Sequence, residues 1–199
     1  MTRQNEAVMQ KLRSALASPP PVRKLLITMR AQSVTRVDLA VAKILLSERN
    51  ERGIYITIDR PDKHVLMILE KHNIAGSSEV SFAAEPRPKR LVIAPGIFSP
   101  AIFIGEMLSR LSDPQSGSTL DAELRGMNFL MVDNLSSLAV YNGPRGIDAC
   151  FGHVAMFLDR YRSMRFIAVA GRDSLGALGP GATGFFNAEV GIPDEWLID

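Results

Sequence analysis

The carboxylate of Asp133 has the residue type and the placement for chemistry on phosphates. It ends the apolar stretch "FLMVD" and is followed by "NLSSL". A buried strand that delivers one carboxylate to the edge of a sheet is how nucleotide-hydrolysing enzymes hold the magnesium ion that bridges the phosphates. An aspartate at the end of a strand also commonly caps the next turn through its side chain. The pattern leaves both interpretations open.

Asp59 ends a second stretch of strand type, "YITID", and is followed by Arg60 and Pro61. In a catalytic interpretation, its carboxylate polarises a water molecule as a general base. In a structural interpretation, it pairs with Arg60 or caps the turn that Pro61 enforces. Asp59 is the catalytic candidate that the sequence offers.

The loop "RAQSVTR", residues 30–36, connects an apolar strand to an apolar helix. Such a loop often binds phosphate, because the first helical N–H groups are unpaired and the helix dipole favours an anion. A phosphate-cradling loop has the form G-x-x-x-x-G-K-[ST]. Aligning Arg36 with the lysine places Arg30 and Thr35 at the glycines, and Val37, which cannot ligate a metal, at the hydroxyl. The loop therefore keeps the place of a phosphate site without most of its chemistry, and the side chains left for nucleotide contact are Gln32, Ser33, Thr35 and Arg36.

A glycine-rich segment, "GPGATG" at 179–184, formally matches the dinucleotide fingerprint G-x-G-x-x-G. It lies beyond the last expected strand, no helix clearly follows it, and too few residues remain for the acidic residue of that motif. We therefore expect a mobile loop or a hairpin turn here. A nucleotide cofactor bound at this end of an α/β enzyme remains an alternative. The histidines lack the spacing of a metal site, and Cys150 has the surroundings of a core thiol.

The elements that position these residues alternate between strands and helices, which predicts an α/β fold with a mainly parallel sheet and helices on both faces. We expect five strands, at 24–29, 53–59, 90–95, 127–133 and 165–171, and a short edge strand at 79–84. The expected helices are 37–49, 62–72, 98–111 and roughly 147–162, and 112–126 is expected to be an irregular loop with room for one helical turn. Parallel strands gather their following loops at one edge, where ligands bind.

The order of these motifs resembles the RecA and KaiC-type ATPase family over roughly residues 23–174. The resemblance is carried by "RVDLAVAKILL", "GIYITID", "LVIAP", "MNFLMVDNLSSLAVYN" and "FIAVAGRDS". It implies a RecA-like three-layer sandwich with five or more strands and ATP with magnesium as cofactors. It further implies that Asp133 is the magnesium-linked aspartate and Asp59 the catalytic acid. Ser136 or Ser137 then matches the following serines, and Arg172 or Asp173 the sensor.

The composition excludes several classes of protein. With 199 residues, 46% of them hydrophobic, the chain can bury a substantial core. A formal charge of +2 is too balanced to indicate a nucleic-acid or membrane surface. A single cysteine excludes an internal disulfide, and no apolar run reaches membrane-spanning length. Without a recognisable secretion signal, a cytoplasmic location is expected.

We expect one α/β domain over residues 22–199, preceded by an appendage helix and a proline-rich linker in residues 1–21. That helix either packs on its own domain or docks a partner. The degenerate loop favours a pseudo-ATPase that binds nucleotide weakly or not at all and acts as a regulatory or scaffold protein through a protein partner or self-association. An ATP-binding or ATPase domain with an atypical loop is the alternative, and hydrolysis of ATP would then be its reaction.

Overall fold

The described residues contain seven strands, which form one parallel sheet in the order β3-β4-β2-β5-β6-β1-β7. The computed structural model describes residues 3–17, 23–74, 80–82, 91–95 and 118–194. The predicted α/β fold, a RecA-like sandwich with a parallel sheet of five or more strands, is confirmed. The strands are β1 (Lys24–Met29), β2 (Gly53–Thr57), β3 (Val80–Phe82), β4 (Leu91–Pro95), β5 (Phe129–Val132), β6 (Arg165–Gly171) and β7 (Ala188–Gly191).

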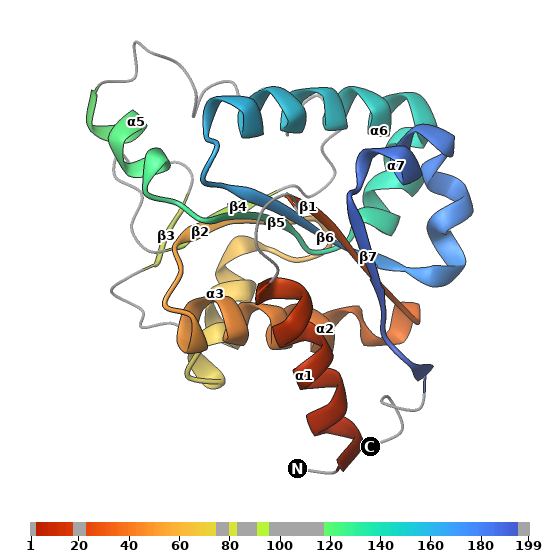
Figure 1. Cartoon of the computed structure of the whole chain (residues 1–199), viewed down its shortest axis with the longest axis horizontal. Coiled ribbons are helices and arrows are strands. Elements are labelled where there is room, and N and C mark those ends of the chain that lie inside the picture. The colour runs from red at the N-terminus through yellow and green to blue at the C-terminus, as the bar shows by residue number, and fades with distance from the viewer. Residues whose placement is uncertain (1–2, 18–22, 75–79, 83–90, 96–117, 195–199) are drawn as a thin grey trace.

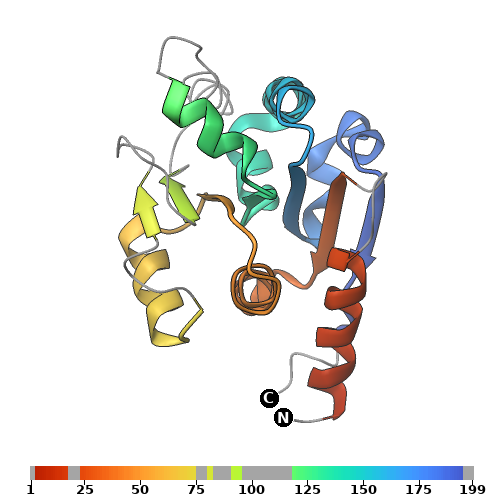
Figure 2. The same cartoon turned by 60° about the vertical axis from the view of Figure 1, so that its left-hand side comes forward.

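Helices cover both faces of this sheet. Figure 1 shows α1, α2 and α3 on one face and α5, α6 and α7 on the other, and the turned view of Figure 2 shows the same three layers. No described helix has the length and apolarity to cross a membrane. The helices are α1 (Arg3–Ala17), α2 (Val34–Ala42), α3 (Asp62–Lys71), α5 (Ser118–Arg125), α6 (Leu135–Arg160) and α7 (Pro180–Phe185). Two 3-10 elements, η1 (Ala31–Ser33) and η5 (Arg172–Leu178), and one π-helical element, η2 (Lys43–Glu48), accompany them.

The continuous apolar runs of the strands follow from burial on both faces. Successive side chains of a strand point to opposite sides. In β6, Phe166 and Ala168 join the core under α6, whereas Ile167 and Val169 join the core over α1 and α2. A polar residue at any of these positions would face one of the two cores.

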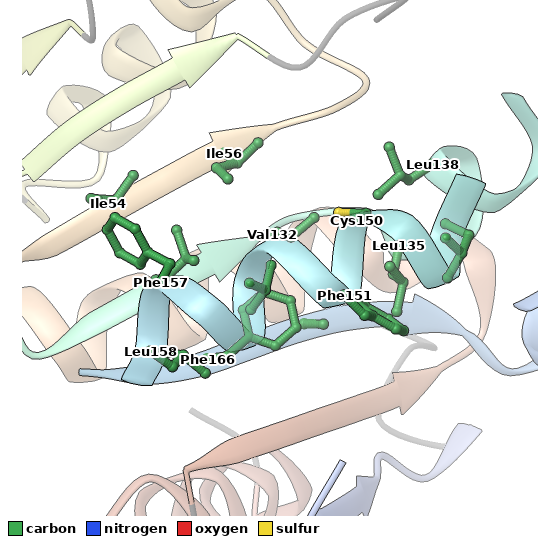
Figure 3. Packing of buried hydrophobic residues seen from close by; sticks show 14 of the residues in the cluster. Ile54, Ile56, Val132, Leu135, Leu138, Cys150, Phe151, Phe157, Leu158 and Phe166 are labelled. Atoms are coloured by element: carbon green, nitrogen blue, oxygen red, sulfur yellow. The ribbon is translucent and has the colours of Figure 1, made fainter. Parts of the chain in front are cut away.

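The core under α6 shows how this long helix covers the strands (Figure 3). Cys150 is 1% exposed, and burial raises the pKa of its thiol to about 12. The predicted core thiol is therefore confirmed. The residues that Figure 3 labels are Ile54, Ile56, Val132, Leu135, Leu138, Cys150, Phe151, Phe157, Leu158 and Phe166.

The first helix packs on the same chain. Its apolar face joins the core that contains β1 and α2, and Leu12 and Leu16 are fully buried there. Arg13 reinforces the contact through hydrogen bonds to Glu48, 2.8 Å from its Nε. The face that could have docked a partner is thus occupied within the chain.

The helix predicted at roughly 147–162 is the second part of α6, and a first part that was not predicted precedes it from Leu135. The Asn134 side chain caps this start by accepting the Ser137 N–H at 3.2 Å. Gly143, with a φ of 64°, interrupts the helix just before Pro144. Both residues normally end a helix, so the sequence hid the first part of α6.

The glycine-rich segment forms α7 and leads to the seventh strand, so the prediction of a mobile loop or hairpin turn was wrong. Phe185 stacks on Phe151 with ring centroids 4.3 Å apart, and this packing holds the segment on α6. Ala188 then pairs with Leu25 in a parallel ladder beside β1.

Two further differences concern helix boundaries. The first core helix starts at Val34 instead of residue 37, and it continues into the π-helical turn η2. Within the stretch 112–126, expected to be an irregular loop with room for one helical turn, residues 118–125 form the longer helix α5. The helix expected at 98–111 lies outside the described residues.

Candidate functional site

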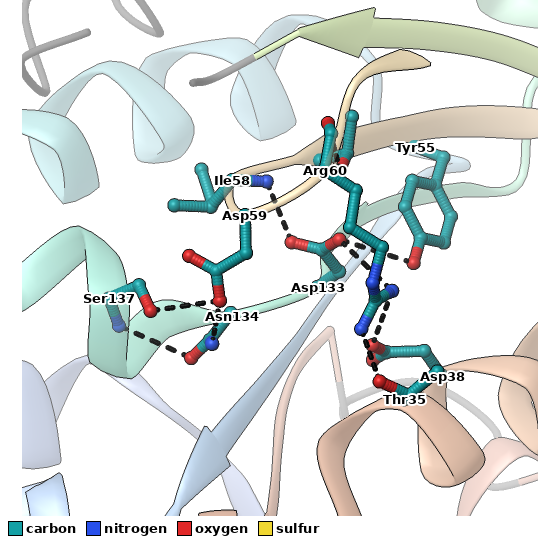
Figure 4. Close-up of polar contacts among 10 residues, drawn as sticks. Thr35, Asp38, Tyr55, Ile58, Asp59, Arg60, Asp133, Asn134 and Ser137 are labelled. Carbon is teal, nitrogen blue, oxygen red and sulfur yellow. Dashed lines mark hydrogen bonds and ion pairs between the residues drawn. The ribbon is translucent and has the colours of Figure 1, made fainter. Parts of the chain in front are cut away.

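The loops after β1, β2, β5 and β6 meet at one edge of the sheet, because these strands are parallel neighbours. Asp133 follows β5 directly, and the Asp59-Arg60 pair comes shortly after β2. Figure 4 shows the Arg60 side chain between Asp133 on one side and Thr35 and Asp38 of α2 on the other. The edge therefore brings together residues that lie up to about 100 positions apart in the chain.

Asp133 is fully buried beneath this edge. Its Oδ1 accepts the Ile58 N–H at 2.7 Å, and its Oδ2 lies 3.5 Å from the Tyr55 hydroxyl and 3.7 Å from Arg60 Nη1. Burial raises the pKa of Asp133 to about 6, although the Ile58 N–H and Arg60 act to lower it. Asp133 is thus held by the strand beside it, and the neighbouring Asn134 performs the capping that we considered for Asp133.

Asp59 points away from that buried group and lies at the surface. Its Oδ2 accepts the Ser137 hydroxyl at 2.9 Å and the side-chain amide of Asn134. Of the alternatives for Asp59, pairing with Arg60 is not what the structure has, because Arg60 turns toward the buried carboxylates. Asp59 instead fastens the loop after β2 to the start of α6.

Arg60 connects the loop after β2 to α2. Its Nη2 donates to the Thr35 hydroxyl at 2.5 Å, and its Nη1 lies 3.5 Å from Asp38 Oδ2. Burial acts to lower the pKa of Arg60, but the carboxylates of Asp38 and Asp133 raise it overall, so the guanidinium stays charged. Thr35, a predicted nucleotide contact, is thereby engaged by a side chain of the protein itself.

The loop that was compared with a phosphate cradle forms the 3-10 turn η1. The Ser33 N–H donates to Arg30 O at 3.0 Å, and the Val34 N–H donates to Ala31 O. Ser33 is buried, whereas the Gln32 and Arg36 side chains are exposed. The Ser33 and Val34 N–H groups therefore bond to carbonyl groups of the same turn.

The sensor region that the resemblance placed at Arg172 and Asp173 lies in η5. Arg172 donates to Asp194, 3.2 Å away, and to Ile192 O, so it holds the end of β7. The Asp173 side chain is exposed. The Ser136 hydroxyl accepts the Gly171 N–H at 2.7 Å and joins the start of α6 to the end of β6.

A cavity of about 200 Å³ opens between the loop after β1, the start of α6 and the end of β6. Its lining is uncharged, with serine hydroxyls, an asparagine amide and the ring of Tyr141. Ligand pockets usually measure roughly 300–1,000 Å³, so this one suits a small group better than a whole nucleotide. The lining residues are Ala31, Val34, Asn134, Ser136, Ser137, Val140, Tyr141, Gly171 and Ser174.

The described residues do not fit a magnesium–nucleotide site. A guanidinium already faces Asp133, and Val37 has no oxygen for a metal. Among the residues that the structure describes, no group of three or more His, Cys, Asp or Glu could hold a metal ion. Asp133 therefore does not present the free carboxylate that metal binding needs.

Asp38, Tyr55 and Arg60 are the site residues that sequence reasoning missed. Asp38 carries a signal, because it lies four positions after Val34 on the face that α2 buries. A charged residue at such a position needs a partner inside the protein. The signal does not say which cation supplies it.

Comparison with known proteins gives a fold but no family. No protein-family model matches the chain, and no curated protein matches it. Among solved structures, the chain is similar to a DUF1998 helicase, MrfA, whose crystal structure is bound to DNA and AMPPNP. The TM-score is 0.56 at 12% sequence identity, over 98% of this chain and 27% of the helicase chain. The chain thus spans about a quarter of that helicase, and the likeness at this identity shows a shared fold.

Proposed function

We propose that this chain is a RecA-like domain that does not hydrolyse nucleotides and acts as a regulatory or scaffold protein. The observation that carries the proposal is the closed turn η1, in which the Ser33 and Val34 N–H groups bond to carbonyls of the same turn. A phosphate loop works by turning such N–H groups toward the anion. The arrangement around Asp133 supports the same conclusion, since a guanidinium faces the carboxylate that would accompany magnesium.

Titration calorimetry with ATP and ADP, each with and without magnesium, tests this proposal together with a phosphate-release assay. We expect no phosphate release and no magnesium-enhanced heat. Magnesium-dependent micromolar binding with turnover would refute the proposal and favour an ATPase with an atypical loop. In that case Arg36→Ala would weaken binding, and Arg145→Ala, an exposed arginine on α6, is the matched control.

Weak nucleotide binding is a second candidate, and the cavity of about 200 Å³ favours it. The cavity lies where doubly wound folds bind ligands, and the helicase that shares this fold was crystallised with AMPPNP. Its uncharged lining suits one fragment of a nucleotide, held by hydroxyl groups. This candidate predicts calorimetric heat that does not depend on magnesium and that Ser174→Leu reduces by narrowing the cavity.

A scaffold needs a surface for its partner, and α6 offers exposed apolar side chains. Val140 is 71% exposed and Met156 is 72% exposed. Covering either side chain would remove apolar surface from water, which favours association. Light scattering tests self-association: a mass above that of one chain that falls on Val140→Ser and Met156→Ser would support it, and a monomer would direct the search to other partners.

A further inference from the structure

Two carboxylates and one cation are enclosed together beneath the carboxyl edge of the sheet. Asp38 is 2% exposed and Asp133 is fully buried, and the Arg60 guanidinium lies 3.5 Å from one and 3.7 Å from the other. Buried carboxylates require a counter-charge, and removal of one partner from a buried pair leaves an uncompensated charge. Arg60 is the cation that forms ion pairs with both carboxylates.

The carboxylate oxygens of Asp38 lack hydrogen-bond partners in this arrangement of the described residues. Neither of its oxygens has a hydrogen-bond partner among the described residues, because the contact with Arg60 is an ion pair that is too long for a good hydrogen bond. A cavity of about 10 Å³ lies beside it, lined in part by Asp38, Tyr55 and Arg60. Such a space is about the size of one water molecule. Asp38 thus lines a small space with carboxylate oxygens that have no hydrogen-bond partner among the described residues.

We propose that the Arg60 guanidinium is a tethered cation that occupies the place of a divalent metal ion and closes a latent cation site formed by Asp38 and Asp133. This inference rests on the proposed function and extends it from the nucleotide to the metal ion that would bind at the same site. Carboxylates and a hydroxyl are oxygen ligands of the kind that Mg²⁺ and Mn²⁺ prefer. Arg60 supplies one positive charge between the two acidic side chains and engages the Thr35 hydroxyl, so it already takes the place and the oxygens that a free cation would need.

Calorimetry with Mn²⁺ as the probe, without nucleotide, tests the inference on the parent, Arg60→Ala and Arg30→Ala. Arg30 is the matched control, since it lies at the same edge in an exposed ion pair with Asp194. We expect saturable Mn²⁺ binding by Arg60→Ala alone. Mn²⁺ at about one hundred times its Kd should raise the melting temperature of this variant by roughly 5 to 10 °C and leave the parent unchanged. A folded Arg60→Ala that does not bind Mn²⁺, or equal binding by the parent, overturns the inference.

A second variant keeps the inference testable if Arg60→Ala does not fold without metal. Asp38→Asn combined with Arg60→Met removes one negative and one positive charge together. We expect this double variant to melt at a higher temperature than Arg60→Ala and to bind no Mn²⁺. A double variant that is no more stable than Arg60→Ala would show that Arg60 is not the counter-charge. ATP hydrolysis by the parent would refute the proposed function, whereas these Mn²⁺ measurements judge the cation site by itself.

Discussion

Replacement of Asp133 by Asn should remove a defined part of the pH dependence of folding. The variant keeps a side-chain oxygen that can accept the Ile58 N–H, which Asp133 bonds at 2.7 Å, but it cannot ionise. The other charged groups that face the position, Arg60, Asp38 and Asp59, remain in both proteins. The difference between parent and variant therefore reports the ionisation of Asp133 together with its effect on the neighbouring Asp38, whose pKa the charge of Asp133 raises.

The sign and size of the effect follow from the pKa of Asp133. Burial raises it from 3.8 to about 6, and this rise corresponds to about 3 kcal/mol. Between these values the unfolded chain has lost its proton while the folded protein keeps it. The contribution to stability is therefore fully present below about pH 4 and is lost as the pH rises through about 6. Relative to the variant, the parent should lose about 3 kcal/mol of unfolding free energy between pH 4 and pH 7.

Urea unfolding of both proteins at half-unit steps from pH 4 to pH 8, followed by circular dichroism, measures this difference. The free-energy difference between parent and variant should fall across pH 4 to 6 and stay flat above pH 7. Parallel pH profiles throughout this range would refute the reasoning, because they would mean that Asp133 ionises equally in the folded and unfolded chain.

Other substitutions test the packing. Gly53→Ala places a Cβ 2.5 Å from the facing aromatic ring of β5 and should cost roughly 1–3 kcal/mol of unfolding free energy in urea melts, whereas Gly152→Ala, which meets nothing within 4 Å, should be neutral or stabilising. Leu12→Ala should cost about 2–5 kcal/mol because this α1 side chain is fully buried, and Gln10→Ala on the exposed face should change little. The Cys150 thiol should react with a maleimide only as fast as the protein opens, so labelling by mass spectrometry should accelerate in urea; rapid labelling of the native protein would contradict its burial.

The sequence predicts the centre of the fold well because the central strands are buried on both faces. A continuous apolar run such as "RFIAVAG" has no other stable place than a covered sheet. β7 could not be found in this way, because "AEVG" is short and half-exposed. It is held by its ladder with β1 and by the Thr28 hydroxyl, 3.1 Å from Glu189. These are contacts with a strand about 160 residues earlier in the chain.

The sequence predicted where the candidate site lies, but it did not predict which contacts the side chains make there. A carboxylate after an apolar strand marks the edge where Asp133 lies, and from the loop composition we predict a phosphate cradle that has lost its glycines. The direction in which the Arg60 side chain points does not follow from its neighbours in the sequence. Its neighbour Asp59 is the closest carboxylate in sequence, yet the guanidinium faces Asp38 and Asp133, because buried carboxylates gain more from a cation than an exposed one does.

The place of β1 in the sheet has a consequence for biosynthesis. Both neighbours of β1 come from the last part of the chain, and Lys24 pairs with Phe166. At about 5–20 residues per second, a ribosome needs roughly 7 to 30 s to make the intervening residues. During that time the apolar side chains of Leu25 and Ile27 have no strand beside them. The yield of correctly folded protein should therefore depend on chaperone supply and growth temperature, even in variants whose finished fold is as stable as that of the parent.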